Sequence, residues 1–192
     1  MKKIIAVICF LIVTGLQTYA QKEKGFDKEK VFVGTGINLG FFNGFILGLN
    51  PEIGYSLNRF IDAGVATNMN YITQNDPYSS LTYRQFAFGG GPFIRIWPAS
   101  MFFIGGQFEY NSINYSVKEN GVVTGREKFN APSILVGGGY GNRLIGQSQF
   151  STSIMVDILK ADHSPYIDSY GRLQPVFRTT FTFYLRDRKR GR

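Results

Sequence analysis

Residues 81–117 alternate strictly between two kinds of side chain, and this stretch constrains the fold more than any other part of the sequence. Between residues 86 and 96 the even positions are apolar or small, while the odd positions carry small or polar side chains and one aromatic ring. After a break at residues 98–100 the alternation resumes and continues to Asn111. Alternation of this length indicates β-strands, because successive side chains of a strand point to opposite faces of the sheet.

The two faces of this predicted hairpin differ in kind. Bulky side chains share one face, and glycines, amides and isolated charges occupy the other. A soluble sheet covers its apolar face with a core of similar bulk. A small barrel in a lipid bilayer instead turns its apolar side chains outward and encloses the small and polar ones. We therefore predict a membrane barrel. The alternative is a soluble, lipocalin-like carrier whose bulky face lines a cavity.

The same alternation recurs along the chain and predicts eight strands. They cover residues 31–41, 46–57, 60–72, the two arms of 81–117, 129–141, 147–160 and 172–186. Tight turns are predicted at 58–59, 98–100 and 142–146, long polar loops at 73–80, 118–128 and 161–171, and a short outer turn at Asn43-Gly44. Short periplasmic turns, long outer loops and an even strand number are typical of outer-membrane barrels. The predicted fold is all-β: an eight-stranded antiparallel up-and-down transmembrane β-barrel over residues 31–186.

Residues 1–20 have the features of a secretory signal peptide. A basic start precedes a short apolar run, residues 4–16, and the small side chains of Thr18 and Ala20 predict cleavage before Gln21. The apolar run is too short for a transmembrane helix, which needs about 20 residues. We expect a polar periplasmic lead-in at residues 21–30, a basic tail at 187–192, and a location in the outer membrane of a Gram-negative-type cell.

Composition excludes several kinds of site. Cys9 is the only cysteine and lies within the predicted signal peptide, so the mature protein has no disulfide, zinc thiolate or cysteine nucleophile. The formal net charge is +8, but the positive residues are scattered and no nucleic-acid-binding motif accompanies them. The basic tail is better suited to anionic lipid head groups or to solvent. We predict no cofactor and no metal.

Four strands carry a Pro-x-apolar motif at outward-facing positions, one in each descending strand. The prolines are Pro51, Pro92, Pro132 and Pro175. Proline lacks the N–H that a strand ladder needs, so it is usually found at sheet edges or bulges. A closed barrel has no edge, and we therefore predict bulges or weakened pairing at these four positions.

Two groups of side chains are candidates for a functional role. The charges predicted to face the lumen are Glu52, Arg95, Glu109, Asp157 and Arg178. They could form an ion path or an acid–base pair, but we favour a structural network, because a buried charge needs compensation and eight strands leave room only for their own side chains. Aromatic residues near the predicted strand ends are assigned to an interfacial girdle. They are Tyr71, Trp97, Tyr110, Tyr140 and Tyr184.

His163 is the only histidine and precedes Ser164 in the last predicted outer loop. A histidine beside a serine hydroxyl is the pairing that a hydrolase acting on outer-leaflet lipid requires. Adjacent residues of an extended chain point in opposite directions, so the pair needs a turn to come together. A solvated polar loop is the favoured interpretation, and a lipid-modifying hydrolase using His163 is the alternative.

Several segments resemble a known family, the outer-membrane β-barrel domain family. They are the signal peptide, GINLGF, NPEIGYSL, GGGPFIRIWP, GGQFEYNSINY and the proline-marked repeats, and the resemblance covers residues 31–185. It implies a barrel like the small eight-stranded OmpA/OmpX-type proteins, with PorT-like proteins as relatives and a role in secretion as a further alternative. We expect a non-enzymatic structural or interaction protein whose outer loops meet its partners. The expected partners are membrane lipid and an extracellular or periplasmic protein.

Overall fold

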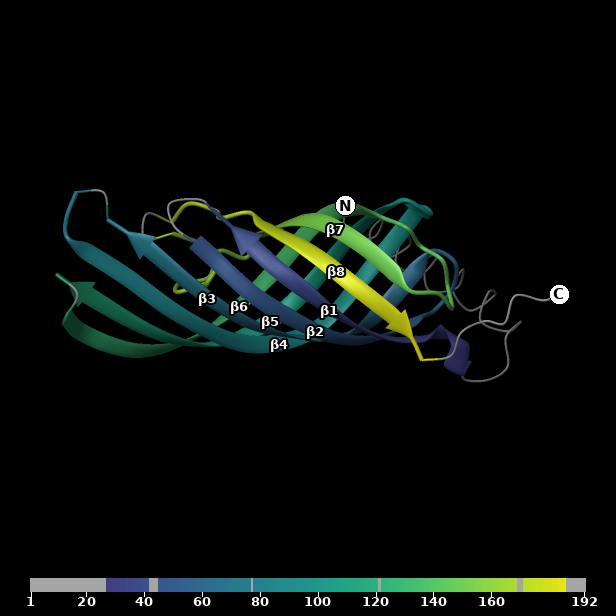
Figure 1. Cartoon of the computed structure of the whole chain (residues 1–192), viewed down its shortest axis with the longest axis horizontal. Helices are drawn as coiled ribbons and strands as arrows, with labels where there is room; N and C mark the ends of the chain where they lie inside the picture. The colour runs from purple at the N-terminus through teal and green to yellow at the C-terminus, as the bar shows by residue number, and fades with distance from the viewer. Residues whose placement is uncertain (1–26, 42–44, 77, 121, 169–170, 186–192) are drawn as a thin grey trace, which may run out of the picture.

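The computed structural model describes residues 27–41, 45–76, 78–120, 122–168 and 171–185. Eight antiparallel strands form a closed ring in which each strand pairs with its neighbours in sequence and β8 pairs with β1 (Figure 1). The strands are β1 (Val31–Gly40), β2 (Phe45–Ser56), β3 (Ile61–Asn75), β4 (Leu81–Ala99), β5 (Phe102–Glu119), β6 (Val122–Gly141), β7 (Gln149–Asp157) and β8 (Val176–Tyr184). The predicted eight-stranded up-and-down barrel is confirmed.

A short 3-10 helix, η1 (Lys28–Lys30), precedes β1 and lies at the same end of the ring as the end of β8 (Figure 1). Asp27 caps it by accepting a hydrogen bond of 2.9 Å from the N–H of Glu29. Among the described residues, no helix is long and apolar enough to cross a membrane. The predicted signal peptide, lead-in residues 21–26, the Asn43-Gly44 turn, Arg186 and the basic tail lie outside the described residues.

Side chains alternate between the two faces of the strands as the sequence predicts. On the outer face, Ile53, Ile104 and Ile154 are 55%, 57% and 49% exposed. On the inner face, Asn68 and Glu109 are fully buried. The bulky face therefore does not line a cavity, and the lipocalin-like alternative is wrong. Because soluble monomers rarely expose a continuous apolar patch above roughly a few hundred Å², an apolar band around the whole ring is the surface of a membrane barrel.

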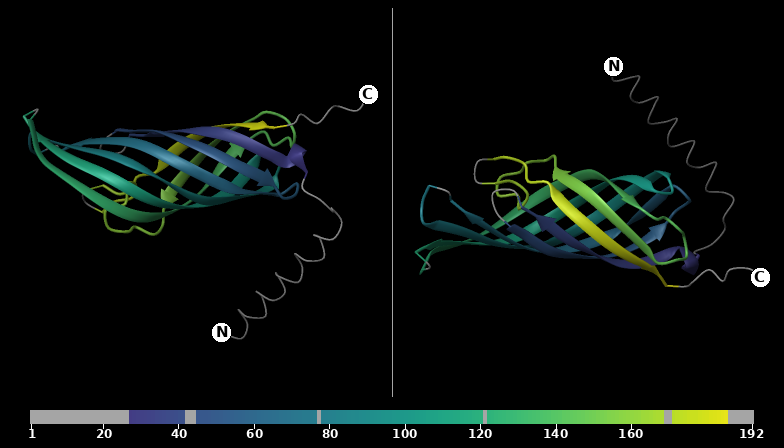
Figure 2. Two further views of the ribbon diagram at one scale, coloured as in Figure 1. Left: turned by 90° about the horizontal axis from the view of Figure 1, so that it is seen from below. Right: turned by 45° about the horizontal axis from the view of Figure 1, so that its top comes forward.

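The outer ends of β4, β5 and β6 continue beyond the ring as an open sheet, as Figure 2 shows at the end of the barrel away from η1. We call residues 81–86, 113–119 and 122–131 the sheet extension. Pairing of β6 with β7 begins only at Leu135 and Asp157, so the outer part of β6 has no strand on that side. The loop predicted at 118–128 is therefore wrong. The charges and glycines of residues 118–128 resemble the composition of a loop. A β-hairpin that lies outside the membrane can nevertheless form with such residues, because it needs no apolar face.

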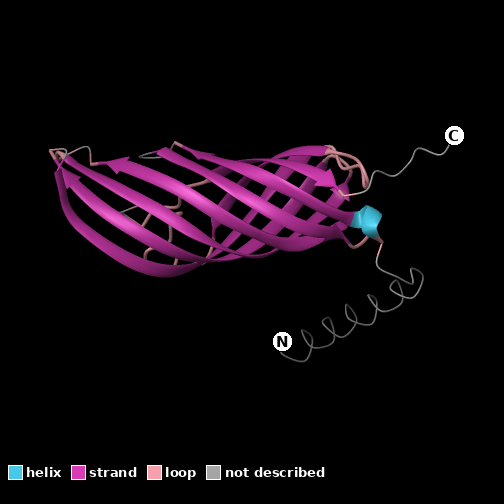
Figure 3. Ribbon diagram, turned by 60° about the horizontal axis from the view of Figure 1, so that its bottom comes forward, coloured by secondary structure: helices cyan, strands magenta, loops and turns pink. Residues whose placement is uncertain are grey.

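The connection between β7 and β8 also differs from the prediction. Both strands are shorter than predicted, and the described residues between them, 158–168 and 171–175, turn back into the mouth of the barrel instead of forming an outer loop over 161–171. Ser164, Tyr166 and Gln174 are at most 3% exposed. In Figure 3 this connection lies among the strands, well short of the tip of the sheet extension. Side-chain hydrogen bonds to the lumen, described below, draw it inward.

The predicted weakening of the ladder is confirmed at two of the four prolines. The β2–β3 pairing is interrupted at Pro51 and the β4–β5 pairing at Pro92, and the register is unchanged across both gaps, so neither forms a bulge. The side-chain amide of Asn50 donates to the Thr67 carbonyl at 3.2 Å, next to the position where proline lacks its N–H. Pro132 lies beyond the last β6–β7 pair and Pro175 precedes β8, so on those sides neither interrupts a strand pair.

Candidate functional site

The end of the lumen on the side of η1 is closed by a cluster around Asp62. Its carboxylate accepts hydrogen bonds from Arg143 at 2.6 and 3.2 Å, from the Trp97 indole at 2.8 Å and from the Ser56 hydroxyl at 2.6 Å. Arg143 comes from the β6–β7 turn and also donates to the Asn58 carbonyl in the β2–β3 turn, at 2.9 Å. The cluster joins these two turns to the lumen wall. Sequence reasoning missed Arg143 because residues 142–146 were predicted only as a tight turn.

Two of the aromatic residues predicted for the girdle lie in this cluster. Trp97 and Tyr184 are only 3% and 8% exposed, and the Tyr184 hydroxyl lies 2.8 Å from the Ser56 hydroxyl. The girdle prediction is wrong for both. Their positions have the inward parity of β4 and β8, and their polar atoms find partners in the lumen. Tyr71, Tyr110 and Tyr140 are 40%, 57% and 53% exposed on the outer face, where a girdle role stays a prediction.

Glu52 and Arg95 form an ion pair in the lumen next to this cluster. The guanidinium donates two hydrogen bonds to the carboxylate, at 2.9 and 2.5 Å, in the bidentate geometry that arginine favours. The Arg95 guanidinium carbon also lies 4.5 Å from the centre of the Phe93 ring. The two residues are 43 positions apart in sequence and meet because their side chains both enter a narrow lumen from β2 and β4.

Arg178 and Glu109 form the second buried ion pair. The charged atoms lie 3.6 Å apart, beyond hydrogen-bond distance, and both residues are at most 3% exposed. Arg178 donates to the amide oxygens of Asn38 at 2.8 Å and Gln107 at 2.5 Å. Glu109 accepts from the Tyr166 hydroxyl at 2.7 Å. Neutral partners therefore hold each charged group in place, and the pairing neutralises them.

Tyr166 connects the β7–β8 connection to this network. Its side chain is fully buried, and its hydroxyl accepts a hydrogen bond from the Asn70 amide at 3.0 Å besides donating to Glu109. Asn38 donates to the Asn70 oxygen at 2.8 Å. The hydrogen bonds run without a break from the inserted connection to Arg178 on β8. Sequence reasoning missed Tyr166, which no strand alternation marks.

Asp157 does not join the lumen ion pairs. Its carboxylate accepts hydrogen bonds from the backbone N–H groups of Ile134 and Leu159, each at 3.0 Å, and from the Ser164 hydroxyl at 2.6 Å. It thus fixes the end of β7 and the start of the inserted connection. Of the five predicted lumen charges, four form two carboxylate–arginine pairs and Asp157 has this separate position.

The structure does not bring His163 and Ser164 together as a base and a nucleophile. The His163 side chain is exposed, and its ring stacks on Phe129 with centres 3.9 Å apart and planes inclined by 3°. Ser164 is buried and its hydroxyl lies 3.1 Å from that of Ser133, besides donating to Asp157. Within the described residues, no group of three or more His, Cys, Asp or Glu side chains is placed to hold a metal.

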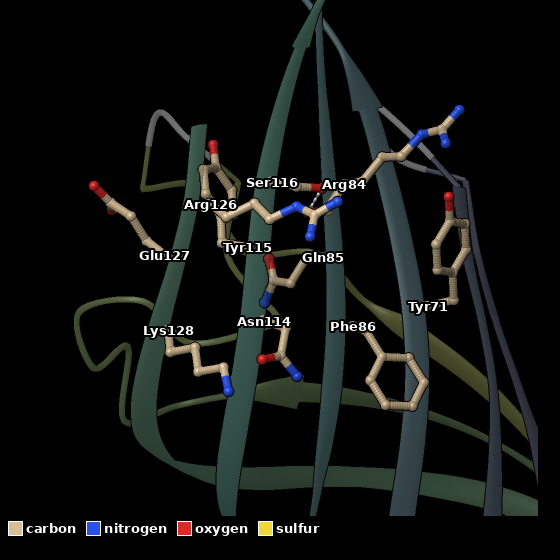
Figure 4. Close-up of a pocket in the computed structure, with 10 residues that line it drawn as sticks. All are labelled: Tyr71, Arg84, Gln85, Phe86, Asn114, Tyr115, Ser116, Arg126, Glu127 and Lys128. Atoms are coloured by element: carbon tan, nitrogen blue, oxygen red, sulfur yellow. Dashed lines mark hydrogen bonds between the residues drawn. The ribbon is translucent and has the colours of Figure 1, made fainter. Parts of the chain in front are cut away.

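A cleft of about 560 Å³ lies on the outer face of the strands where the sheet extension begins (Figure 4). Tyr71 and Phe86 lie at one side of it, and Arg84, Arg126 and Lys128 supply positive charge. The cations occupy even positions of β4 and β6, the same parity as the outward apolar residues. Sequence reasoning missed this cleft because the outer part of β6 was predicted as a loop.

No family model and no curated protein matches the chain. Three similar solved structures are small outer-membrane β-barrels. Neisserial surface protein A has a TM-score of 0.47 and 10% identity, over 81% of this chain and 96% of that protein. Ail, the attachment invasion locus protein of Yersinia pestis, has a TM-score of 0.43 and 11% identity over 80% and 94%. The N-terminal β-barrel domain of Pseudomonas aeruginosa OprF has a TM-score of 0.42 and 12% identity over 79% and 97%.

The closed ring of eight strands, apolar outside and polar inside, decides the architecture. The chain has the fold of a small OmpA/OmpX-type barrel. At these identities and TM-scores the solved structures carry nothing about the activity of this barrel, so we base its function on its own residues. Kinship with PorT-like proteins stays a prediction.

Proposed function

We propose that the protein is a non-enzymatic outer-membrane barrel that acts by binding at its outer surface and neither conducts solutes nor turns over a substrate. The observation that carries this proposal is the inserted β7–β8 connection, whose buried Tyr166 is hydrogen-bonded to Glu109 and Asn70 inside the lumen. A barrel that exchanged solutes would need a continuous water-filled path at this level. The separation of His163 from Ser164 speaks against hydrolysis.

The crowding of the lumen supports the same conclusion. A Cβ atom added at Gly48 would overlap the Asn70 side chain, and one added at Gly139 would lie 2.5 Å from the Phe103 ring. Such close approaches leave glycine as the residue that fits opposite a large neighbour. The Asp62 cluster, the Glu52–Arg95 pair and the Arg178–Glu109 pair follow one another along the barrel, so each level is occupied by side chains.

The sheet extension is the element best suited to meet a protein partner. Its face that continues the lumen wall carries a row of aromatic rings: Tyr83 stacks on Tyr115 with centres 6.0 Å apart, Tyr115 meets Phe129 at 6.3 Å, and Phe129 stacks on His163. Rigid aromatic side chains are common anchors of binding surfaces. An extracellular protein that inserts an apolar segment over this row is the partner we favour, with membrane lipid around the barrel.

Planar-bilayer recording tests whether the barrel is closed. The refolded full chain should show no steady single-channel conductance, because three levels of side chains obstruct the lumen. Tyr166→Ala should increase brief openings, since it removes the contact that holds the β7–β8 connection against Glu109 and Asn70. A steady, wide conductance from the unmodified protein would show that these networks do not seal the barrel, and the proposal would fail.

Single-cysteine labelling tests which end of the barrel faces the outside. Cys9 is the only native cysteine and lies in the predicted signal peptide, so Ser80→Cys in the β3–β4 connection and Ser148→Cys in the β6–β7 turn each introduce one thiol. Both serines are exposed. On intact cells a membrane-impermeant maleimide should label Ser80→Cys, and it should label Ser148→Cys only after the outer membrane is opened. The reverse pattern would put the sheet extension in the periplasm.

A further inference from the structure

The outer face changes from aromatic to cationic where the sheet extension begins. Tyr71 and Phe86 are paired across β3 and β4 and are 40% and 44% exposed at the top of the apolar band. One step further along β4 on the same face is Arg84, about 7 Å away at the usual rise of a strand. On β5 and β6 the pairs at this level are Asn114 with Lys128 and Ser116 with Arg126. A surface that is apolar toward the ring and cationic toward the tip of the sheet extension is suited to an amphipathic ligand.

The cations of this cleft lack the carboxylate partners that the lumen arginines have. Within the described part of the chain, Arg84, Arg126 and Lys128 make no ion pair, whereas every arginine buried in the lumen faces a carboxylate. The Nε atom of Arg84 is buried without a hydrogen-bond acceptor. Glu127 also borders the cleft, but Figure 4 shows its side chain pointing away from the three cations. The cleft therefore carries positive charge that no carboxylate of the described residues pairs with.

We propose that this cleft binds the phosphoryl group of a lipid in the outer leaflet, with the acyl chains lying over Tyr71 and Phe86. A phosphoryl group supplies several acceptor oxygens, which guanidinium groups bind in a bidentate manner and lysine binds as a point charge. The Asn114 amide and the Ser116 hydroxyl line the same cleft and add neutral polar groups. Continuity with the apolar band favours a lipid over a free anion, because a free anion would contact only the cationic part of the cleft. The proposal rests on the membrane placement given under the proposed function.

Native mass spectrometry of the full chain in dodecyl maltoside, a detergent without phosphate, tests this assignment. The probe is dioleoyl phosphatidic acid, and the cleft variant is Arg84→Gln/Arg126→Gln/Lys128→Gln. The matched control is Lys28→Gln/Arg59→Gln/Lys160→Gln, which removes the same charge from exposed positions elsewhere. We expect the unmodified protein and the control to retain the lipid equally, and the cleft variant to bind it at least tenfold more weakly. A heat-modifiability gel verifies that each variant is folded.

Three results would overturn the proposal. Equal retention by the cleft variant would show that the lipid lies elsewhere, and equal loss from the control would show that only net charge matters. Retention of dioleoylglycerol as strong as that of phosphatidic acid would show that the phosphoryl group is not recognised. Displacement of the lipid by inorganic phosphate at equal concentration would identify a free-anion site instead. None of these results changes the conductance or labelling expected of the barrel, so failure here is distinct from failure of the proposed function.

Discussion

Replacing Glu109 with glutamine should lower the free energy of unfolding of the barrel by about 3–5 kcal/mol, the range observed when one partner of a buried ion pair is removed. The guanidinium of Arg178 cannot give up its proton in compensation. Its hydrogen-bond partners, Asn38 and Gln107, are neutral. The substitution also places an amide where Tyr166 now donates to a carboxylate. Urea unfolding in thin bilayers, followed by the change in gel mobility between folded and unfolded barrel, measures the loss.

The double variant Glu109→Gln/Arg178→Gln is the control for this interpretation. It removes both charges from the lumen, so it should be more stable than the single Glu109→Gln variant although it carries one more substitution. If instead the two single losses simply add, the residues do not compensate each other. A Glu109→Gln variant as stable as the unmodified protein would show that the Arg178 charge is already satisfied by its amide partners.

The period-two pattern predicted which side of the sheet each strand residue faces, and it did so even where another rule misled. Trp97 has the odd parity of the inward residues of β4, yet its place near a strand end suggested a girdle. The structure follows the parity, because the Asp62 carboxylate offers the indole a partner inside. The sequence predicted that carboxylates and arginines would pair within the lumen, but it did not predict which residue would pair with which. That Arg95 meets Glu52 and Arg178 meets Glu109 depends on strand register, which the sequence does not specify.

Features outside the membrane band were harder to predict, because no apolar face constrains them there. The cations at 84, 126 and 128 have the outward parity, but the charges and glycines of residues 118–128 resemble a loop, so the sequence did not place them on one surface. The inserted β7–β8 connection depends on single contacts such as those of Tyr166 and Asp157. Such contacts form because closure of the ring brings distant residues together, so the sequence alone does not indicate them.

Substituting Ile154 by arginine should cost the folded barrel about 2–4 kcal/mol, the penalty of a lipid-facing arginine near the bilayer midplane. Ile154 lies midway along the outer face of β7, is 49% exposed, and pairs with Gly138 and Phe177 of the neighbouring strands. Ile158→Arg, at the exposed residue that directly follows β7, should cost only about 0–1 kcal/mol, because the penalty falls toward the interface. Urea titration of both variants gives the comparison. Equal and small losses at the two positions would mean that this face does not contact hydrocarbon, since water would solvate either arginine alike.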